Sequence, residues 1–448
     1  MIKKQHIVIV GAGLCGTLLG IRLVQRGYRV SLFERRPDLR LIEQDAGRSI
    51  NLALSHRGLM ALATAGLGEV VRDLCIPMRG RLIHAPSGEK WLSPYSGRTD
   101  EYINSISRPG LNALLLEKAD SYENLTIYFE YKCTGVNLET ATGHFTDKSG
   151  EAHVIQGDIL VGTDGAGSVV RRAMMARSTD LLFNFSQNFL RSGYKELSIP
   201  ASASGDFRIE STALHIWPRG KIMIIALPNL DRSFTVTMFP PFGGPAGFNT
   251  LNTPEKVKAF FNEHYPDTLE HLPDLDQEYF TNPSAALGTI KCYPWEAYKK
   301  TLLMGDAAHA IVPFYGQGMN AAFEDVRIFD ELVEQHDGDW SAILPAFSEA
   351  RPTDSNAIAD LAVDNFYEMQ DKVDDVDFIK KRKLEMKLEQ QFPEYYSKYS
   401  LVTFKPELSY NDAMIRGRRQ DEYLLDLVNR KDVDELDLAQ VVEKVNTL

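Results

Sequence analysis

The hydrophobic and polar positions at the N-terminus alternate between a strand-like and a helix-like pattern. Residues 7–10 form an uninterrupted apolar run, which predicts a buried parallel strand. Beyond a glycine-rich segment, apolar residues recur at spacings of four and three from Leu14 to Ile21, which predicts a helix that ends near Gly27. Residues 28–34 return to a strand-like pattern. Together these patterns predict the strand-helix-strand start of an α/β nucleotide-binding domain.

Later segments add strands to this sheet and predict two further regions. Short apolar runs at residues 158–162 and 301–304 each lead into a turn with Gly and Asp, and we expect both to join the N-terminal sheet. Residues 207–240 have the pattern of antiparallel strands joined by tight turns. After about Trp340 the chain is rich in Asp, Glu, Lys, Leu and Ala and poor in Gly, which predicts helices. The expected fold class is α/β, with a discontinuous Rossmann-like domain, an antiparallel-sheet domain and a helical C-terminal region.

Composition and charge narrow the classes of function. The 448 residues include 49 Lys and Arg against 61 Asp and Glu, a formal charge of −12, with no basic run, so no nucleic-acid partner is expected. The four cysteines are far apart and form no Cys-x-x-Cys pair, which argues against a metal site or a disulfide framework and fits a reducing cytoplasm. No apolar run approaches the roughly 18 residues of a membrane span. We therefore expect a soluble, cytoplasmic protein that acts on small molecules.

The first motif that carries chemistry is a glycine turn between the first strand and the first helix. Gly11, Gly13 and Gly16 match G-x-G-x-x-G, which permits a tight turn and a close approach of a pyrophosphate to the helix N-terminus. Glu34 ends the second strand, 23 residues after Gly11, where it can bind ribose hydroxyls. The motif predicts dinucleotide binding. By itself it also fits a nicotinamide dehydrogenase, or a packing turn in an unrelated α/β protein.

A second, longer motif follows the strand predicted at residues 301–304. Asp306 comes directly after that strand, where a carboxylate can bind a ribityl or ribose hydroxyl. The glycine-rich segment at residues 316–320 then opens a helix, whose N–H groups can face a flavin pyrimidine and its developing negative charge. His309 lies inside the motif, and we interpret it as a packing residue because it has no evident proton to move.

A third motif at residues 164–168, with Arg171, again follows a predicted strand. In combination the three motifs resemble the flavoprotein hydroxylases related to para-hydroxybenzoate hydroxylase. In that family the Asp-Gly motif is associated with binding of both FAD and NADPH. The alternative interpretation is that Ser168 caps a helix and that Arg171 is a surface charge.

Four narrower segments, at residues 47–55, 78–81, 215–218 and 227–234, resemble the kynurenine 3-monooxygenase family. The likeness spans residues 5 to about 405 and is weakest at 240–285 and in the charged tail, which lacks the membrane-anchoring helix of eukaryotic members. The resemblance implies an FAD-dependent monooxygenase that uses NADPH and O2. The implied reaction converts L-kynurenine to 3-hydroxy-L-kynurenine through a flavin hydroperoxide, in tryptophan degradation.

Pattern and resemblance together divide the chain into three regions. We expect the FAD-binding domain at residues 1–75, 100–178 and 290–340, and the substrate-binding sheet domain at 76–99 and 179–289. The C-terminal helical region is expected at 341–448. On the resemblance, the residues that contact FAD are Gly11, Gly13, Cys15, Gly16, Glu34, Arg35, Arg36, Ala53, Arg108, Asp306, Gly318, Met319 and Asn320.

The resemblance also assigns the substrate-binding residues. Arg81 and Tyr95 would hold the amino-acid carboxylate of L-kynurenine, joined by Asn365 and Tyr399; a planar, permanently charged guanidinium suits that role. Without the resemblance, such residues are most often solvated or part of a core. The residues expected around the aromatic ring are Leu214, Ile216, Ile225, Leu227, Phe239, Pro313, Phe314, Tyr315 and Met369. Tyr315 departs from relatives with His or Phe at this position.

No catalytic side chain is expected, because FAD carries the oxidation chemistry. Two alternatives stay open from the sequence. The first is another flavoprotein of the same fold, such as a phenol hydroxylase or a prenyl reductase; the Trp-x-Trp-x-Ile-Pro motif of flavin halogenases is absent. The second is a flavin-containing binding or signalling protein whose acidic C-terminal helices contact a partner. NADPH oxidation that depends on kynurenine would separate these alternatives from the expected function.

Overall fold

A six-stranded sheet forms the centre of the N-terminal half of the molecule. The computed structural model describes residues 5–42, 51–371 and 375–448. The strand order is β18-β19-β12-β1-β2-β8, and only β18 runs antiparallel to its neighbour. The segments predicted at 158–162 and 301–304 lie side by side in this sheet, so that prediction is confirmed. The strands are β1 (His6–Val10), β2 (Arg29–Glu34), β8 (Leu125–Phe129), β12 (Ile159–Gly162), β18 (Glu296–Ala297) and β19 (Thr301–Leu303).

Helices and two small sheets surround the central sheet. The largest hydrophobic core of the described chain lies here and includes Ile7, Ile9 and Leu32, all fully buried, as expected for parallel strands covered on both faces. The helices are α1 (Leu14–Gln25), α2 (His56–Thr64), α3 (Gly68–Arg72), α4 (Arg108–Asp120), α5 (Val169–Met175), α6 (Ser178–Leu181), α9 (Asp306–His309) and α10 (Gly318–Gln335). One small sheet has the order β3 (Leu52–Leu54), β7 (Ile103–Ile106) and β4 (Cys75–Met78). The other has the order β11 (Ala152–Gln156), β10 (Thr142–Thr146) and β9 (Lys132–Asn137).

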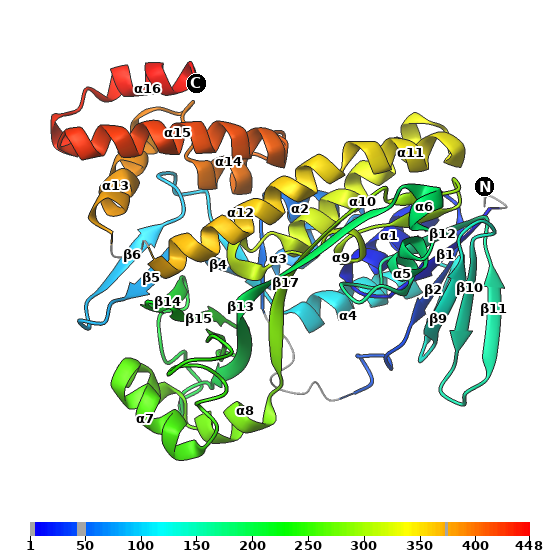
Figure 1. Ribbon diagram of the computed structural model, residues 1–448, viewed down its shortest axis with the longest axis horizontal. Helices are drawn as coiled ribbons and strands as arrows, with labels where there is room; N and C mark the ends of the chain where they lie inside the picture. Colours follow the sequence, from blue (N-terminus) through cyan, green and yellow to red (C-terminus); the bar gives the residue numbers. More distant parts are fainter. Residues whose placement is uncertain (1–4, 43–50, 372–374) are drawn as a thin grey trace.

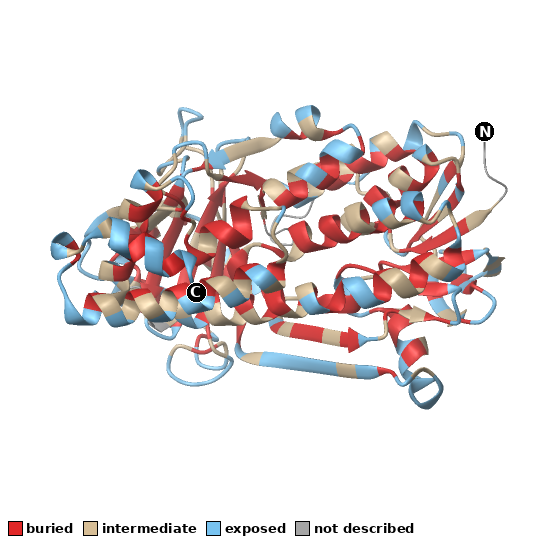
Figure 2. Ribbon diagram, turned by 90° about the horizontal axis from the view of Figure 1, so that it is seen from above, coloured by how far each residue is buried: buried red, intermediate tan, exposed pale blue. Residues whose placement is uncertain are grey.

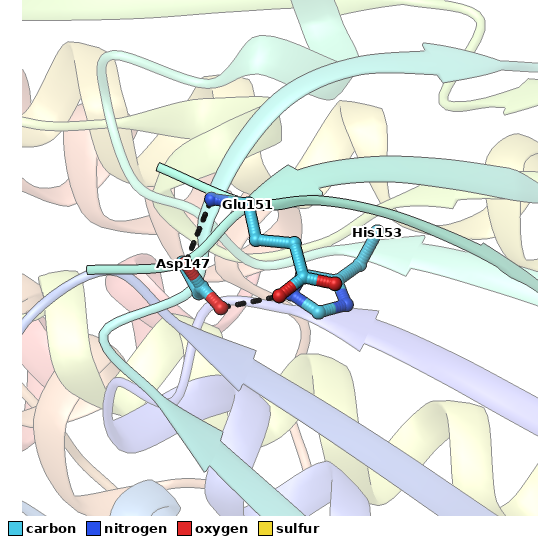
Figure 3. A group of neighbouring side chains, drawn as sticks. All are labelled: Asp147, Glu151 and His153. Atoms are coloured by element: carbon cyan, nitrogen blue, oxygen red, sulfur yellow. Dashed lines mark hydrogen bonds and ion pairs between the residues drawn. The ribbon is translucent and has the colours of Figure 1, made fainter. Parts of the chain in front are cut away.

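The turn between β10 and β11 brings together one His, one Asp and one Glu. Asp147 Oδ1 accepts hydrogen bonds from Ser149 N (2.9 Å) and Glu151 N (3.0 Å), and Asp147 Oδ2 lies 2.9 Å from His153 Nε2 (Figure 3). The hydrogen bonds from Ser149 and His153 hold the pKa of Asp147 below its ordinary value. Because both carboxylate oxygens are used within the turn, this cluster stabilises a β-hairpin.

A seven-stranded, mostly antiparallel sheet forms the second large unit (Figure 1). Its order is β17-β13-β16-β15-β14-β5-β6, and β14 and β5 form its one parallel pair among the described strands. The antiparallel strands predicted at 207–240 are confirmed as β14 to β16. The strands are β5 (Gly80–His84), β6 (Lys90–Pro94), β13 (Asn184–Ile199), β14 (Leu214–Arg219), β15 (Ile222–Pro228), β16 (Phe234–Phe239) and β17 (Ser284–Tyr293); α7 (Pro254–His264), η1 (Pro266–His271) and α8 (Leu275–Thr281) lie beside them.

The C-terminal part is helical, as predicted. The long helix α12 contacts β14 and β17 of the seven-stranded sheet on one side and α15 on the other. Figure 2 shows the buried residues concentrated along the interior between these layers. None of the helices in the described part of the chain is long and apolar enough to cross a membrane. The elements are η2 (Pro313–Tyr315), α11 (Trp340–Ala350), α12 (Pro352–Asp371), α13 (Val376–Gln391), α14 (Lys398–Phe404), α15 (Tyr410–Arg430), η3 (Val433–Glu435) and α16 (Leu438–Asn446).

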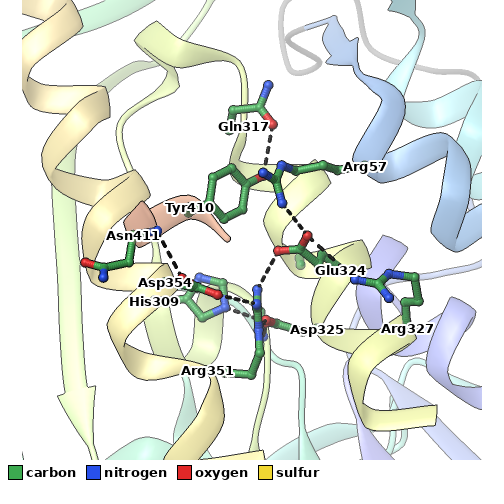
Figure 4. A network of polar contacts seen from close by, with 12 residues as sticks. Arg57, His309, Gln317, Glu324, Asp325, Arg327, Arg351, Asp354, Tyr410 and Asn411 are labelled. Atoms are coloured by element: carbon green, nitrogen blue, oxygen red, sulfur yellow. Dashed lines mark hydrogen bonds and ion pairs between the residues drawn. The ribbon is translucent and has the colours of Figure 1, made fainter. Parts of the chain in front are cut away.

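A buried network of charged side chains joins α10 to the C-terminal helices (Figure 4). Arg351 donates to Asp325 (2.8 Å) and lies 3.1 Å from Glu324, and Glu324 also accepts from Arg57 (2.6 Å). Asp325 contacts His309 as well, at 2.5 Å. Removing one member of such a buried group leaves an uncompensated charge in the interior, so each ion pair favours keeping the elements it joins together. His309 also stacks on Trp295, which confirms its interpretation as a packing residue.

Two buried histidines connect β5 to β14. His84 Nε2 lies 2.9 Å from His215 Nδ1, and His215 Nε2 lies 2.6 Å from the carbonyl oxygen of Glu210. Burial lowers the pKa of His84, and it lowers the pKa of His215 from 6.5 to about 4. Asp267 and Arg219 contact this pair from η1 and β14, and Lys90 acts on it from β6. The folded protein therefore holds His215 neutral at neutral pH.

We predict that His215 makes folding stability depend on pH between about 6.5 and 4. In this window the unfolded chain binds a proton at His215 that the folded chain does not, so the free energy of unfolding falls as the pH falls. Urea unfolding at pH 7 and pH 5 should show a smaller acid-induced loss in His215→Gln than in the unsubstituted protein. An equal loss in both proteins would contradict this role.

Candidate active site

The glycine turn after β1 has the geometry of a dinucleotide-binding turn. Gly11 has a φ of +107°, and a Cβ atom at Gly16 would lie 2.0 Å from the Gly11 carbonyl oxygen. Both positions therefore require glycine. Thr163, the first residue after β12, donates its hydroxyl to the same carbonyl oxygen at 2.8 Å. Thr163 was not among the predicted site residues, although its place at the carboxyl end of a parallel strand beside β1 is a usable signal.

The N-terminus of α1 is open to a ligand. Gly13 is the N-cap and offers no side chain to the first N–H groups, and a Cβ atom at this position would meet nothing within 4 Å. These N–H groups suit a phosphate. Glu34 lies beside the turn, because its carboxylate accepts from Ala12 N (3.1 Å) and from Arg36 Nε (2.8 Å). Cys15 packs its thiol toward the carbonyl oxygen of Ala322 on α10.

The second half of this site combines α9, the N-terminus of α10 and β3. Asp306 is exposed at the first position of α9, and Gly318 and Met319 open α10 without a side-chain cap. Asn320 donates both amide hydrogens, to Ala53 O (2.8 Å) and Gly316 O (2.9 Å). The side chain of Asn320 is thus a structural link between α10 and β3, and only its backbone N–H can serve a cofactor as a donor.

Three predicted arginines lie at the surface around this site. Arg35 and Arg36 directly follow β2, and Arg108 begins α4. Their guanidinium groups are exposed, and Arg36 pairs with Glu34. Exposed arginines at the ends of a parallel strand and a helix fit contacts with phosphate groups. Their part in cofactor binding remains a prediction.

The Asp-Gly motif after β12 holds the cofactor loops together. Ser168 accepts from Arg171 N and caps α5, which confirms the capping interpretation. The interpretation of Arg171 as a surface charge is wrong, because the residue is buried and donates to Ala307 O (2.7 Å) and to Ala166 O. Arg171 therefore ties the motif to α9. Burial raises the pKa of Asp164, whose Oδ2 accepts from Val169 N at 2.6 Å.

The sheet residues predicted to surround the aromatic ring share one face of the seven-stranded sheet. Ile216 pairs with Ile225 across β14 and β15, and Phe239 pairs with Met223 across β16 and β15. Directly paired residues point to the same face, and so do residues two apart, which places Leu214 and Leu227 there too. The alternating residues pack instead into a separate core against α7 and α8.

Arg81 lies on this face, opposite Leu214 in the parallel pair of β5 and β14. Its guanidinium carbon is 4.9 Å from the centre of the Tyr399 ring and 5.6 Å from that of Tyr95, and the two rings stack at 5.3 Å. Within residues 5–42, 51–371 and 375–448, no carboxylate lies within ion-pairing distance of Arg81. The Nε of Arg81 and the hydroxyl of Tyr95 are buried without a hydrogen bond of ordinary geometry to the described chain.

Residues from η2 and α12 lie beside the Arg81 and tyrosine cluster. Tyr315 stacks on Tyr399 at 5.4 Å, and its buried hydroxyl also has no hydrogen-bond partner in the described part of the chain. Asn365 donates to Phe314 O (2.6 Å) and to Met369 Sδ (3.4 Å). Its amide hydrogens are therefore used to hold η2 and α12 together, and its side-chain oxygen is the group left for a ligand.

Three tyrosine hydroxyls close to Arg81 stay protonated at neutral pH. Burial raises the pKa of Tyr95 and Tyr315 well above the ordinary value, and burial also raises the pKa of Tyr399. The side chains around Arg81 therefore combine one permanent positive charge, three neutral hydroxyl donors and an apolar sheet face. A ligand with an anionic group on an aromatic or apolar body would fit: the anion would pair with the charge and the hydroxyls, and the body would contact the apolar face.

A separate cavity of about 380 Å³ lies between the small sheet β3-β7-β4 and the turn joining β15 to β16. None of the predicted substrate-binding residues lines it. At its wall Asn51 donates to Ser105 Oγ (3.2 Å) and to Pro228 O (3.1 Å). Two of the segments that carry the sequence resemblance thus contact each other here: the described part of 47–55 and the segment 227–234. Their hydrogen bonds link the small sheet to the seven-stranded sheet.

Comparison with known proteins identifies the family. The profile of the FAD binding domain family matches residues 4–335. The kynurenine 3-monooxygenase of Myxococcus xanthus (strain DK1622) is 43% identical over 98% of this chain and 95% of its own. That of Dictyostelium discoideum is 40% identical over 99% of each chain. This chain belongs to the kynurenine 3-monooxygenase family. It is an FAD-dependent monooxygenase. The assignment of the glycine turn, α1 and α10 to the FAD site remains a prediction.

Solved structures support the fold. The chain superposes on a tetrameric form of 2-methyl-3-hydroxypyridine-5-carboxylic acid oxygenase with a TM-score of 0.67, at 19% identity, over 88% of this chain and 99% of the other. P. aeruginosa PqsL in complex with 2-aminobenzoylacetate gives a TM-score of 0.66 at 18% identity, over 82% and 97%. At these identities the likeness shows a shared architecture. The division of the chain at the limits given in the sequence analysis remains a prediction.

We predict that Asp306→Ala weakens FAD binding by about tenfold or more, the loss expected for a hydrogen bond to a charged group. The carboxylate of Asp306 makes no hydrogen bond or ion pair to the described chain, so the melting temperature of the flavin-free protein should not change. Glu331→Ala, which removes an exposed carboxylate further along α10, is the matched control. Flavin fluorescence titration measures the affinity, and unchanged affinity in Asp306→Ala would remove this residue from the site.

Proposed function

We propose that this enzyme hydroxylates L-kynurenine at carbon 3 of its ring, with NADPH as the reductant and O2 as the oxidant. NADPH, a proton, O2 and L-kynurenine would give NADP+, water and 3-hydroxy-L-kynurenine. The proposal rests on the relatives' names and on one observation at the sheet face. Arg81 is half-buried, its Nε is fully buried, and it lacks a carboxylate partner in the described chain. FAD, when bound, supplies the transfer of electrons from NADPH and the activation of O2.

The amino-acid end of the substrate would bind at Arg81. A guanidinium is always charged and presents parallel N–H donors that match a carboxylate. The Tyr95 and Tyr399 rings flank Arg81, and their hydroxyls would donate to the same carboxylate. Asn365 was expected to join them as a donor, but its amide hydrogens are already used. We therefore assign its side-chain oxygen to the α-ammonium group of the substrate.

The aromatic end of the substrate would lie against the apolar face of the sheet. Leu214, Ile216, Ile225, Leu227 and Phe239 form this wall, and Phe314 and Tyr315 close it from η2. The ring amine of kynurenine donates electron density to the carbon that is hydroxylated, so the protein needs no base to ionise the ring. The task of the pocket is to orient that carbon and to exclude water. Because FAD would supply the oxidation chemistry and the protein would orient the substrate, no side chain is expected to act as a catalyst.

The experiment that tests this function is product identification. Purified FAD-loaded protein, incubated with NADPH, O2 and L-kynurenine, should consume NADPH in a kynurenine-dependent reaction. Mass spectrometry should find the product heavier by one oxygen atom, and chromatography should match it to 3-hydroxy-L-kynurenine. NADPH oxidation that does not depend on kynurenine, or hydroxylation of simple phenols in preference to kynurenine, would contradict the proposal.

We also predict that Arg81→Ala raises the dissociation constant of L-kynurenine by roughly 10- to 100-fold, because hydrogen bonds to charged groups contribute about 1.5–3 kcal/mol each. Arg81→Lys should restore only part of the affinity, since an ammonium group cannot reproduce the planar pair of donors. FAD affinity should stay the same in both variants. Titration with kynurenine, followed by the absorbance of the bound flavin, measures the dissociation constant of kynurenine. An unchanged dissociation constant in Arg81→Ala would exclude Arg81 from the site.

A further inference from the structure

A single buried carboxylate connects the two tyrosine segments that flank Arg81. Glu389, on α13, is 2% exposed. Its Oε2 accepts from Gly97 N at 2.8 Å, two residues beyond Tyr95. Its Oε1 accepts from Ser397 N at 2.9 Å and from Ser400 Oγ at 2.6 Å. Glu389 therefore holds the loop that carries Tyr95 with one oxygen and the start of the helix that carries Tyr399 with the other.

The donors around Glu389 are all neutral. No lysine or arginine in the described part of the chain lies within ion-pairing distance of its carboxylate. A buried carboxylate that accepts several hydrogen bonds is stabilised by those bonds and fixes the position of each donor. Ser397 is also the N-cap of α14, so its position determines where the helix begins and where Tyr399 projects.

A neighbour on α13 fixes the same loop from a second point. Arg382 donates to Pro94 O (2.6 Å) and to Tyr95 O (2.9 Å). Arg98, in the loop itself, donates to Tyr395 O (2.6 Å) and lies over the ring of Tyr396. The loop at residues 95–98 is thus attached to the C-terminal helices at several points, although it leaves the seven-stranded sheet directly after β6.

We propose that Glu389 is a positioning residue for the substrate, which sets the position of the stacked Tyr95 and Tyr399 rings beside Arg81. The inference rests on the proposed function, in which these groups bind the amino-acid carboxylate. Glu389 does not itself touch the pocket, because its two oxygens face the loop and the start of α14. Through these contacts the C-terminal helices determine how the enzyme recognises the amino-acid end of its substrate.

Two substitutions test the contact between Glu389 and the loop at Gly97, one on each side of it. In Glu389→Gln the side chain keeps its shape, but the amide can accept from only one of the two backbone N–H groups, so one of the two segments is released. In Gly97→Ala the added Cβ atom would lie 2.8 Å from Glu389 Cβ and 2.9 Å from the carbonyl oxygen of Met386, which pushes the loop away from α13. Asp434→Asn, which removes a carboxylate paired with Lys383 and Lys387 on another side of α13, is the control.

The expected result is a change in affinity that depends on the carboxylate of the ligand. Glu389→Gln and Gly97→Ala should each raise the KM for L-kynurenine about tenfold and change kcat by less than twofold. Binding of the decarboxylated amine analogue of kynurenine should change by less than twofold in the same variants. A general loss of structure would instead lower the fraction of active enzyme, and therefore kcat, with both ligands. Asp434→Asn should match the unsubstituted enzyme.

The result that would overturn the inference is an unchanged KM for L-kynurenine in both variants, or an equal loss of affinity for kynurenine and for the decarboxylated analogue. If Glu389→Gln fails to fold, Gly97→Ala and Ser400→Ala decide by the same comparison. Failure of the proposed function is distinguishable, because Arg81→Ala would then leave kynurenine binding unchanged. If Arg81→Ala weakens binding and the Glu389 and Gly97 variants do not, the positioning role alone is wrong.

Discussion

The proposed substrate-binding region depends on one half-buried guanidinium group, that of Arg81, which has no carboxylate partner in the described chain. Arg81 projects from β5 onto the apolar face of the seven-stranded sheet, and stacked tyrosine rings flank it in place of acids. A buried charge is costly unless it is paired and hydrogen-bonded. In the proposed function, the carboxylate of the substrate supplies the missing partner of Arg81. Affinity for the ligand and stability of the protein around Arg81 are therefore linked.

A second constraint is that the cofactor site and the pocket must keep a fixed relative position. The first half of helix α10 carries residues of both regions. Its first turn holds Gly318 and Met319, which are predicted to contact FAD. Glu324 and Asp325, in the next turns, belong to the network with Arg57 and Arg351. Through Arg351 the network reaches the start of α12, the helix that also carries Asn365. The flavin and the residues around the substrate are thus built on one connected frame.

The sequence predicted the parts of the structure that depend on local patterns. The parallel strands, the glycine turn and the C-terminal helices follow from apolar periodicity and from glycine positions, and all three are confirmed. The cofactor fold was predictable because Gly11 and Gly16 are required by backbone geometry within a few residues of each other. The choice of substrate-binding residues depended on the family resemblance, since nothing local distinguishes Arg81 or Tyr399 from ordinary polar residues.

Contacts between distant segments could not be predicted. Arg171 was considered as a surface charge, but α9, far along the sequence, buries it. Asn365 was expected to donate to the substrate, but its hydrogens are used by Phe314 and Met369. Glu389 lies in a helix with a charged and irregular pattern, and its role depends on the loop after β6 folding back onto it. Such side chains become interpretable only when the tertiary arrangement is known.

The most direct test of this account is a crystal structure of the FAD-loaded enzyme with L-kynurenine bound. We expect the amino-acid carboxylate on the Arg81 guanidinium, between the hydroxyls of Tyr95 and Tyr399, with the α-ammonium group near the side-chain oxygen of Asn365. The aromatic ring should lie on the sheet face formed by Leu214, Ile216, Ile225, Leu227 and Phe239. A complex in which the carboxylate binds elsewhere and Arg81 contacts no ligand would contradict the account.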